Sequence, residues 1–406
     1  MDILFVHNNF PGQYLHLATH LAKRPGYRVF AIGNDKCAGV PGVTIARYKI
    51  RKLPPEGLHP FAARFDSESR RAEGVLQAAL ALRKAGVEPA VIAVHPGWGE
   101  NLPLKDVWPD ARLVVFCEFF YRPEGADVGF DPEFAQTDVA RMVRLRAKNA
   151  AQLLALVDAQ AGVAPTRWQR SLYPDAFLDR ISVVHDGIDT RWIRPDTPER
   201  IVLPTGHALN PGEEIVTFVG RNLEPYRGYH VFMRALPAIM AARPQARIVI
   251  VGGEGVSYGA AAPEGTTWKQ VFLDEVRGRI DPTRVIFAGM LDHPTFVKLF
   301  RLSSVHVYLT YPFVLSWSML EAMATGCLVV GSATPPVEEI IRDGQNGLLV
   351  PFFDTAALAE RVIEACARPG AFRPLREAAR RLVVEQYDLA TVCLPAQLAL
   401  MGLGDA

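Results

Sequence analysis

Short apolar runs alternate with longer stretches of helical period along the whole chain. The runs are rich in β-branched and aromatic residues, and the longer stretches repeat apolar residues every three or four positions. This alternation predicts repeated strand–helix units with parallel strands that helices cover on both faces. The predicted strands of the first half are Ile3–His7, Arg28–Gly33, Val91–His95, Leu113–Cys117, Leu153–Val157 and Ser182–His185. Those of the second half are Ile215–Gly220, Arg247–Gly252, Arg284–Ala288, Val305–Leu309 and Leu328–Gly331.

A stretch rich in Pro and Gly, PDTPERIVLPTGHALNPGEE over residues 195–214, separates the two sets of strands. The chain has 406 residues, and single hydrophobic cores stop growing near ~250 to 300 residues. We therefore expect an α/β protein with two Rossmann-like domains that face each other across a cleft, over residues 1–195 and 210–383. The apolar tail YDLATVCLPAQLALMG predicts that a C-terminal helix within residues 384–406 returns to the first domain.

Charge and composition narrow the kinds of partner. The 44 Lys and Arg residues against 43 Asp and Glu residues give a formal charge of +1, so no overall field attracts a nucleic acid. The five cysteines are scattered without a C-x-x-C pair, and no metal-ligand cluster is apparent. The start, MDILFVHNNF, is acidic where a signal peptide is basic, and no run of ~18 apolar residues is present. We expect a cytoplasmic protein that binds no metal or other cofactor and no nucleic acid.

Two arginines follow the first strand of the second half, in VGRNLEPYRG. In parallel α/β sheets ligands bind beyond the carboxyl ends of the strands, so residues in these positions are candidates for the site. The guanidinium groups of Arg221 and Arg227 could both donate hydrogen bonds to one diphosphate. Such donors would be needed if the protein transfers a sugar from a nucleotide diphosphate, because negative charge develops on the diphosphate as the glycosidic bond breaks. The alternative is that both are solvated loop residues.

The segment TYPFVLSWSMLEAMATG predicts a helix whose first amides, near Leu315, Ser316 and Trp317, would bind an anion. Glu321 lies about one turn inside this helix, where its carboxylate would accept the two hydroxyls of a ribose. The same letters also fit a capping box, in which Glu321 satisfies backbone donors behind Ser318. Both readings are open at this point.

Three segments, VGRNLEPYRG, SWSMLEAMATG and EEIIRDGQNGLLV, occur in the order and spacing of retaining glycosyltransferases of family GT4. The first half, with HNNFPGQ, HPGWGENL and CEFFYRPEGADVGFDPEF, resembles the N-terminal domain of a bacterial subgroup of that family. The resemblance implies the GT-B fold and metal-independent transfer of a sugar from a nucleotide diphosphate sugar to a hydroxyl acceptor, with retention. The acceptor would be a glycan, a lipid carrier or a small molecule, as in polysaccharide biosynthesis.

The family's motifs carry over to particular residues of the second half. Arg221 matches the diphosphate-binding arginine, and Arg227 stands where the family usually has lysine. Glu321 matches the second, ribose-binding glutamate of the E-x7-E motif. Phe313 occupies the position of the first glutamate, which contacts the donor sugar in relatives. Either Phe313 packs in the wall of the site, or the sugar is held here through apolar contact or through backbone amides.

Further residues are assigned to the site by the same resemblance. His95 follows a strand, where relatives place a histidine that points at the transferred sugar; the alternative is a structural histidine. With Arg221 and Arg227 it completes the expected catalytic set. The remaining residues expected to bind the nucleotide sugar are Gly12, Gln13, Gly253, Met290 and Leu291.

The expected acceptor residues are Glu118 and Tyr121, which follow the strand RLVVFC. Alternatively, Glu118 is a buried partner for an arginine. The stretch 138–148 carries four basic residues against one acid, which favours contact with anionic lipid or a phosphorylated carrier at the inner membrane face, or else an ordinary solvated face. The four are Arg141, Arg144, Arg146 and Lys148.

Two other functions fit parts of the pattern. A GT-B sugar-nucleotide epimerase or sugar-phosphate synthase would share the nucleotide site and differ in the first domain. A non-catalytic protein that binds nucleotide or glycan would explain the missing first glutamate at Phe313.

Overall fold

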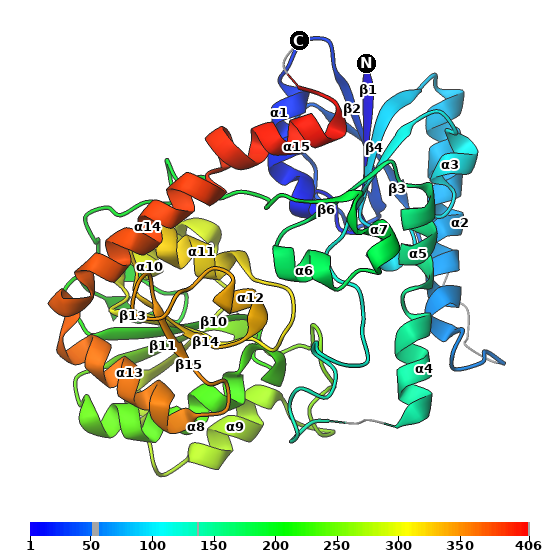
Figure 1. Ribbon diagram of the computed structural model, residues 1–406. Helices are drawn as coiled ribbons and strands as arrows, with labels where there is room; N and C mark the ends of the chain where they lie inside the picture. The colour runs from blue at the N-terminus through cyan, green and yellow to red at the C-terminus, as the bar shows by residue number, and fades with distance from the viewer. Residues whose placement is uncertain (51–56, 136–137, 405–406) are drawn as a thin grey trace. The chain divides into compact units, whose positions relative to one another are not determined.

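The computed structural model describes residues 1–50, 57–135 and 138–404 and divides the chain into two compact units (Figure 1). Unit 1 comprises Met1–Gly187 together with the residues from Leu389 onward, and unit 2 comprises Ile188–Asp388. Each unit is built on one parallel sheet flanked by helices, so the prediction of two Rossmann-like domains is confirmed. The C-terminal residues belong to unit 1, as the apolar tail predicted.

Unit 1 has a seven-stranded parallel sheet in the order β3-β2-β1-β4-β5-β6-β7. Successive residues of β1 point to opposite faces: Leu4 and Val6 belong to one core, and Ile3 and Phe5 to the other. Both faces of the sheet are therefore buried, which explains why its strands read as unbroken apolar runs. The strands are β1 (Asp2–Val6), β2 (Arg28–Asn34), β3 (Val43–Tyr48), β4 (Pro89–Val94), β5 (Arg112–Phe116), β6 (Ala161–Ala164) and β7 (Ile181–Val183).

Helices from both ends of the chain cover one face of this sheet. In Figure 1, α1 (blue) lies beside α15 (red), and Leu17 and Leu21 of α1 share a core with Leu398 and Met401 of α15. The apolar residues of α2 and α5 pack on the opposite face. The helices of unit 1 are α1 (Leu15–Ala22), α2 (Ala63–Lys84), α3 (Leu104–Val107), α4 (Val139–Ala147), α5 (Ala150–Asp158), α6 (Arg167–Ser171), α7 (Asp175–Leu178) and α15 (Leu394–Met401).

Unit 2 has a six-stranded parallel sheet in the order β12-β11-β10-β13-β14-β15. Strands β10 and β13 are neighbours in the middle of the sheet, so the segments that follow them leave from adjacent points of its carboxyl edge. The strands are β10 (Ile215–Asn222), β11 (Arg247–Gly253), β12 (Val285–Gly289), β13 (Val305–Tyr308), β14 (Val329–Ser332) and β15 (Leu348–Val350). The helices are α8 (Tyr229–Ala242), α9 (Trp268–Val276), α10 (His293–Leu302), α11 (Trp317–Ala324), α12 (Pro335–Glu338), α13 (Thr355–Ala367) and α14 (Arg373–Tyr387).

One predicted strand is wrong. Residues 153–157 lie in α5, where Gln152, Ala155 and Leu156 are buried and Leu154 and Val157 are largely exposed. This spacing follows the helical period, and the segment contains mainly Ala and Leu, which favour helices. The strand at this place in the sheet is β6, whose sequence AGVA has small residues and a weak strand signal. Strands β3 and β15, each at one edge of its own sheet, were not predicted.

The stretch expected to link the domains lies inside unit 2. The boundary falls at Gly187 and Ile188, and the antiparallel strands β8 (Ile201–Val202) and β9 (Ala208–Leu209) form a hairpin within residues 195–214. Ile201, Leu203 and Leu209 are buried in a core of unit 2. These few apolar residues anchor a segment whose Pro and Gly content otherwise resembles a linker.

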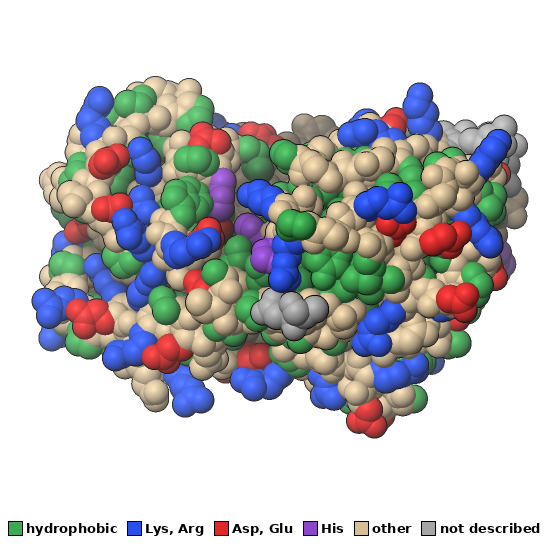
Figure 2. Space-filling view, turned by 90° about the horizontal axis from the view of Figure 1, so that it is seen from above, with side chains coloured by type: hydrophobic (Ala, Val, Ile, Leu, Met, Phe, Trp, Pro, Cys, Tyr) green, Lys and Arg blue, Asp and Glu red, His purple; other side chains and the backbone are tan. Residues whose placement is uncertain are grey.

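The surface carries charges of both signs side by side. Figure 2 shows acidic and basic side chains intermingled over one face, in keeping with the formal charge of +1. Within the described residues, no helix has the length and apolar character needed to cross a bilayer.

Candidate active-site residues

Arg221 lies at the carboxyl end of β10, with its side chain exposed. In the described part of the chain this guanidinium has no hydrogen-bond or ion-pair partner. A free arginine at the carboxyl edge of a parallel sheet is placed to bind an anion through forked donors.

Arg227, by contrast, is buried just beyond the same strand. Its Nη1 donates to Thr310 Oγ1 at 2.8 Å and to the Val314 carbonyl at 2.9 Å, and the side chain is 6% exposed. The guanidinium also lies 5.3 Å from the ring centroid of Tyr258 and 5.9 Å from that of Phe313. Arg227 therefore ties the β10 turn to the segment after β13, and the reading of a solvated loop residue is wrong for it.

Phe313 belongs to an aromatic cluster. It is 5% exposed, and its ring centroid lies 4.8 Å from that of Tyr258 and 5.5 Å from that of Tyr226. Tyr226 also lies 4.7 Å from Tyr311. The geometry favours packing of Phe313 in the wall over direct contact with a sugar.

Two side chains of the β10 turn hold the loop that follows β11. Asn222 accepts the Gly255 N–H through Oδ1 at 3.1 Å, and buried Glu224 accepts the backbone N–H groups of Ser257 and Tyr258 at 3.2 and 3.3 Å. The loop begins at Gly253, where a Cβ atom would lie 2.5 Å from Asn222 Oδ1, so only glycine fits. Sequence reasoning passed over Asn222 and Glu224, although both lie between the two predicted arginines.

Helix α11 begins where the sequence predicted an anion site. Ser316 is its N-cap and accepts the Ser318 N–H at 3.4 Å, while the Ser316 N–H donates to Tyr308 Oη at 2.8 Å. The Leu315 N–H has no hydrogen-bond partner among the residues that the structure describes, and its side chain is buried. The Trp317 side chain is 38% exposed.

Glu321 is bound by a histidine rather than by the backbone. Its Oε1 lies 2.6 Å from His293 Nε2, so the capping-box reading, with Ser318 as cap, is wrong. The side chain of Glu321 is 8% exposed. His293 opens α10 directly after Met290 and Leu291, which are exposed and partly exposed respectively. Sequence reasoning did not include His293, because only folding brings α10 against α11.

In unit 1, three loops of the carboxyl edge meet in one hydrogen-bond network. Glu118 follows β5 and accepts from Gln13 Nε2 at 2.9 Å through Oε1, and its Oε2 lies 3.3 Å from His95 Nε2. Gln13 Oε1 in turn lies 2.8 Å from His7 Nε2. Glu118 is thus paired with a histidine and an amide, and not with an arginine as the alternative held.

Backbone contacts define the direction of every bond in this network. His95 Nδ1 accepts the Gly97 N–H at 3.1 Å, and His7 Nδ1 accepts the Asn9 N–H at 2.9 Å. Both neutral rings must therefore carry their proton on Nε2. His7 donates to Gln13, and Gln13 and His95 both donate to Glu118.

The protonation states agree with these directions. Burial lowers the pKa of His7 to about 3, so its ring is neutral near pH 7. Burial also disfavours the charged form of Glu118, but the hydrogen bond from His95, together with that from Gln13, holds the pKa of Glu118 below its ordinary value. Unit 1 therefore presents a carboxylate, 31% exposed, whose orientation two donors define.

Gly12 occupies a position that excludes any side chain. Its φ is +48°, and a Cβ atom would lie 2.5 Å from the Cε1 and Nε2 atoms of His7. The missing side chain lets the loop after β1 close over the His7 ring and deliver Gln13 to Glu118.

Tyr121 is held by Asn149, which accepts its N–H at 3.0 Å and donates to its carbonyl at 2.8 Å. Lys148 Nζ lies 3.5 Å above the Tyr121 ring, and burial lowers the pKa of this lysine to about 8. Arg144 and Arg146 of α4 are exposed. The basic stretch is thus divided between a packed lysine and solvated arginines.

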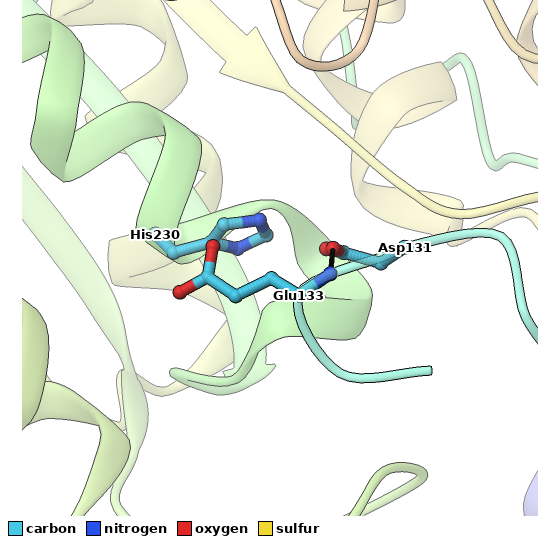
Figure 3. A group of neighbouring side chains, drawn as sticks. All are labelled: Asp131, Glu133 and His230. Atoms are coloured by element: carbon cyan, nitrogen blue, oxygen red, sulfur yellow. Dashed lines mark hydrogen bonds between the residues drawn. The ribbon is translucent and has the colours of Figure 1, made fainter. Parts of the chain in front are cut away.

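The loop before α4 contains a tight turn in which Asp131 Oδ1 accepts the Glu133 N–H at 3.0 Å (Figure 3). His230, drawn in the same figure, lies on α8 of unit 2. Because these side chains are divided between the units, we assign no metal site to them.

Two units that are each built on a parallel Rossmann-like sheet, with the C-terminal segment returned to the first unit, are the features of the GT-B fold. Residues 25–193 match the model of the glycosyl transferase family 4 group, and residues 213–368 match that of glycosyl transferases group 1. Each of the two regions thus matches a family model of glycosyltransferases.

Individual relatives agree with this assignment. The chain is 30% identical over 220 residues to D-inositol 3-phosphate glycosyltransferases of Mycobacterium bovis and Mycobacterium tuberculosis, a match that covers 53% of this chain and 43% of theirs. The matched region thus spans less than half the length of those relatives.

Solved structures share the fold at low sequence identity. Sucrose-phosphate synthase from Thermosynechococcus elongatus has a TM-score of 0.73 at 18% identity, with 99% of both chains covered. Anabaena HepE, determined in complex with UDP and glucose, has a TM-score of 0.64 at 16% identity, with 98% of both chains covered.

Proposed function

We propose that this protein transfers a sugar from a nucleotide diphosphate sugar to a hydroxyl acceptor, with retention of the anomeric configuration. One observation carries the proposal: the unpaired guanidinium of Arg221 ends β10, and the segment with the Leu315 N–H and Glu321 leaves the adjacent strand β13. Cationic donors, a free amide and a carboxylate at one sheet edge match the diphosphate and the ribose of such a donor.

In this proposal the residues of unit 2 act through electrostatics. Arg221 and the helix amides stabilise the negative charge that develops on the leaving diphosphate. Arg227 adds positive charge, and its contacts with Thr310 and Val314 hold the two strand ends together. Because these groups supply the charge, we propose that no metal ion is required. We infer a front-face substitution, in which a leaving phosphate oxygen accepts the proton of the acceptor hydroxyl.

The residues of unit 1 are proposed to bind the acceptor and the transferred sugar. His95 and Gln13 hold Glu118 as a carboxylate. This carboxylate can accept a hydrogen bond from a hydroxyl group of the acceptor substrate. Tyr121 lies three positions further along the same loop. We assign His95 to the catalytic set through Glu118, because its one N–H, on Nε2, already donates to that carboxylate and orients it.

A screen of donors tests the proposal. UDP-, GDP-, ADP- and dTDP-sugars are examined by thermal shift in buffer that contains EDTA, and bound donors are then tested for transfer to alkyl glycosides and polyprenyl phosphates. We expect at least one donor to raise the melting temperature and to form product without added metal. The anomeric proton coupling of the product reports retention. Absence of binding by every donor, or a need for a divalent ion, would contradict the proposal.

Phe313→Leu tests whether this ring recognises the sugar. Because Phe313 is buried among Tyr226 and Tyr258, we expect the substitution to lower stability by about 1 kcal/mol and to leave the order of preference among donors unchanged. The measurements are thermal unfolding and relative kcat/KM for two sugars on the same nucleotide. A reversed preference with unaltered stability would show that Phe313 contacts the sugar instead.

A further inference from the structure

The carboxylate of Glu321 already has one strong partner in unit 2. Its Oε1 lies 2.6 Å from Nε2 of His293, and no other hydrogen bond to this side chain is found among the described residues. Glu321 is nearly buried in α11, whereas the His293 side chain is 53% exposed at the first position of α10. One oxygen of the carboxylate is therefore occupied, and the other is left for a ligand.

The imidazole is itself held in place. Its ring lies 5.0 Å from that of Trp192 and 6.3 Å from that of Phe296, on which it is stacked. The preceding residue, Asp292, is the N-cap of α10, and it accepts the Thr295 N–H and hydroxyl at 2.9 Å each. These contacts define where α10 begins and so where the imidazole meets Glu321.

The charges around this imidazole are few. Glu321 is the group that α11 presents to it, and Asp292 lies beside it in the chain with its carboxylate bound to Thr295. The segment of Trp192 contributes an aromatic ring, and the neighbouring Arg191 pairs with Asp189. The protonation of His293 is therefore coupled chiefly to Glu321.

We propose that His293 is a positioning residue that orients Glu321 toward the ribose of the nucleotide sugar and makes nucleotide affinity depend on pH near neutrality. The inference rests on the proposed function. A protonated His293 holds Glu321 in one rotamer and cancels its negative charge, which would otherwise repel the diphosphate. Both effects favour binding at the lower pH.

The direction of the titration agrees with the geometry. The hydrogen bond that His293 donates to Glu321 raises the pKa of His293 above its ordinary value near 6.5, so the imidazolium persists further toward neutral pH. The stability contributed by this pair is complete below about pH 6.5 and is lost as the pH rises through the raised pKa of the folded state. Nucleotide affinity should fall over the same interval.

The test uses the full chain and a probe that does not itself titrate. The diphosphate of UDP-glucose, GDP-mannose or ADP-glucose is a diester without ionisation between pH 6 and pH 8, and calorimetry gives Kd for whichever of the three binds most tightly. For the wild type we expect Kd to rise about 3- to 10-fold from pH 6 to pH 8, equivalent to up to one pKa unit of coupling. His293→Gln should remove this dependence, and His293→Ala should also weaken binding at pH 6.

His207→Gln provides the control, because His207 is an exposed histidine of the same unit whose side chain hydrogen-bonds to the hydroxyl of Thr205. This variant should keep the pH dependence of the wild type, and thermal unfolding confirms that each variant is folded. The inference is overturned if the wild-type affinity is the same at both pH values or if His293→Gln keeps the wild-type dependence. Failure of all three nucleotide sugars to bind the wild type at either pH would instead refute the proposed function itself.

Discussion

Replacement of Arg221 with alanine should lower the rate of sugar transfer by roughly 10²-fold or more, the usual cost of removing one group that stabilises developing charge. Arg221 is exposed and unpaired within the described residues, so its loss leaves no buried partner unsatisfied and stability should change little. The measurements are kcat and KM with the donor identified by the screen, together with Kd for its nucleoside diphosphate.

Arg277→Ala is the matched control for this variant. Arg277 is an exposed arginine of the same unit, and its ion pair with Asp274 lies at the surface, where such pairs contribute little. Its removal should leave transfer within about twofold of the wild type. If Arg221→Ala also stayed within that range, Arg221 would have no role in catalysis and the proposed diphosphate site would be misplaced.

Gly12→Ala should have the largest effect in unit 1. The added Cβ would lie 2.5 Å from the His7 ring, and alanine at φ +48° is itself strained by about 1–2 kcal/mol. A displaced His7 releases Gln13, which then no longer holds Glu118. We expect a loss of about 2–4 kcal/mol in stability and at least a tenfold loss in transfer. Binding of the free nucleoside diphosphate should change less than transfer does, because Arg221 and Glu321, which are proposed to bind its diphosphate and ribose, lie in unit 2.

Gly26→Ala is the control that separates the steric contact with His7 from the backbone strain of alanine at a positive φ. Gly26 also has a positive φ, +89°, but a Cβ atom there would meet nothing within 4 Å. This variant should show only the strain of the left-handed backbone, about 1–2 kcal/mol, with normal transfer. Equal losses of transfer in both variants would mean that contact between residue 12 and His7 does not matter for the reaction.

Most strands of both sheets could be predicted because both faces of a parallel sheet are buried, which leaves continuous apolar runs in the sequence. The error at residues 153–157 arose because a largely buried helix can also contain a run of apolar residues. Hydropathy does not distinguish such a helix from a buried strand; only the spacing of its buried positions does. The edge strands β3 and β15 are partly polar or very short, so the signal was weak there. The segment 195–214 was predicted to be the linker because its composition is typical of loops. Three of its aliphatic residues are buried in a core of unit 2 and make the segment part of that unit.

The candidate residues were predicted unevenly for a similar reason. Arg221 and Arg227 lie at the end of a strand or just beyond it, and Glu321 lies in the first turns of a helix that follows another strand; local sequence and a family motif mark these positions. Their partners are distant in sequence: Thr310 for Arg227, and His293 for Glu321. No local pattern indicates such pairs, since they form only when the sheet places the two segments together.

The sequence by itself determined the class of fold, the division into two sheets and the chemical types available at each carboxyl edge, because strand periodicity and residue chemistry are local properties. Only the tertiary structure decided how those groups are used. Arg221 is free while Arg227 is buried, Phe313 lies within an aromatic cluster, and Glu118 and Glu321 are each oriented by a histidine. These outcomes depend on burial and on hydrogen bonds between segments up to 105 residues apart, which are properties of the packed chain.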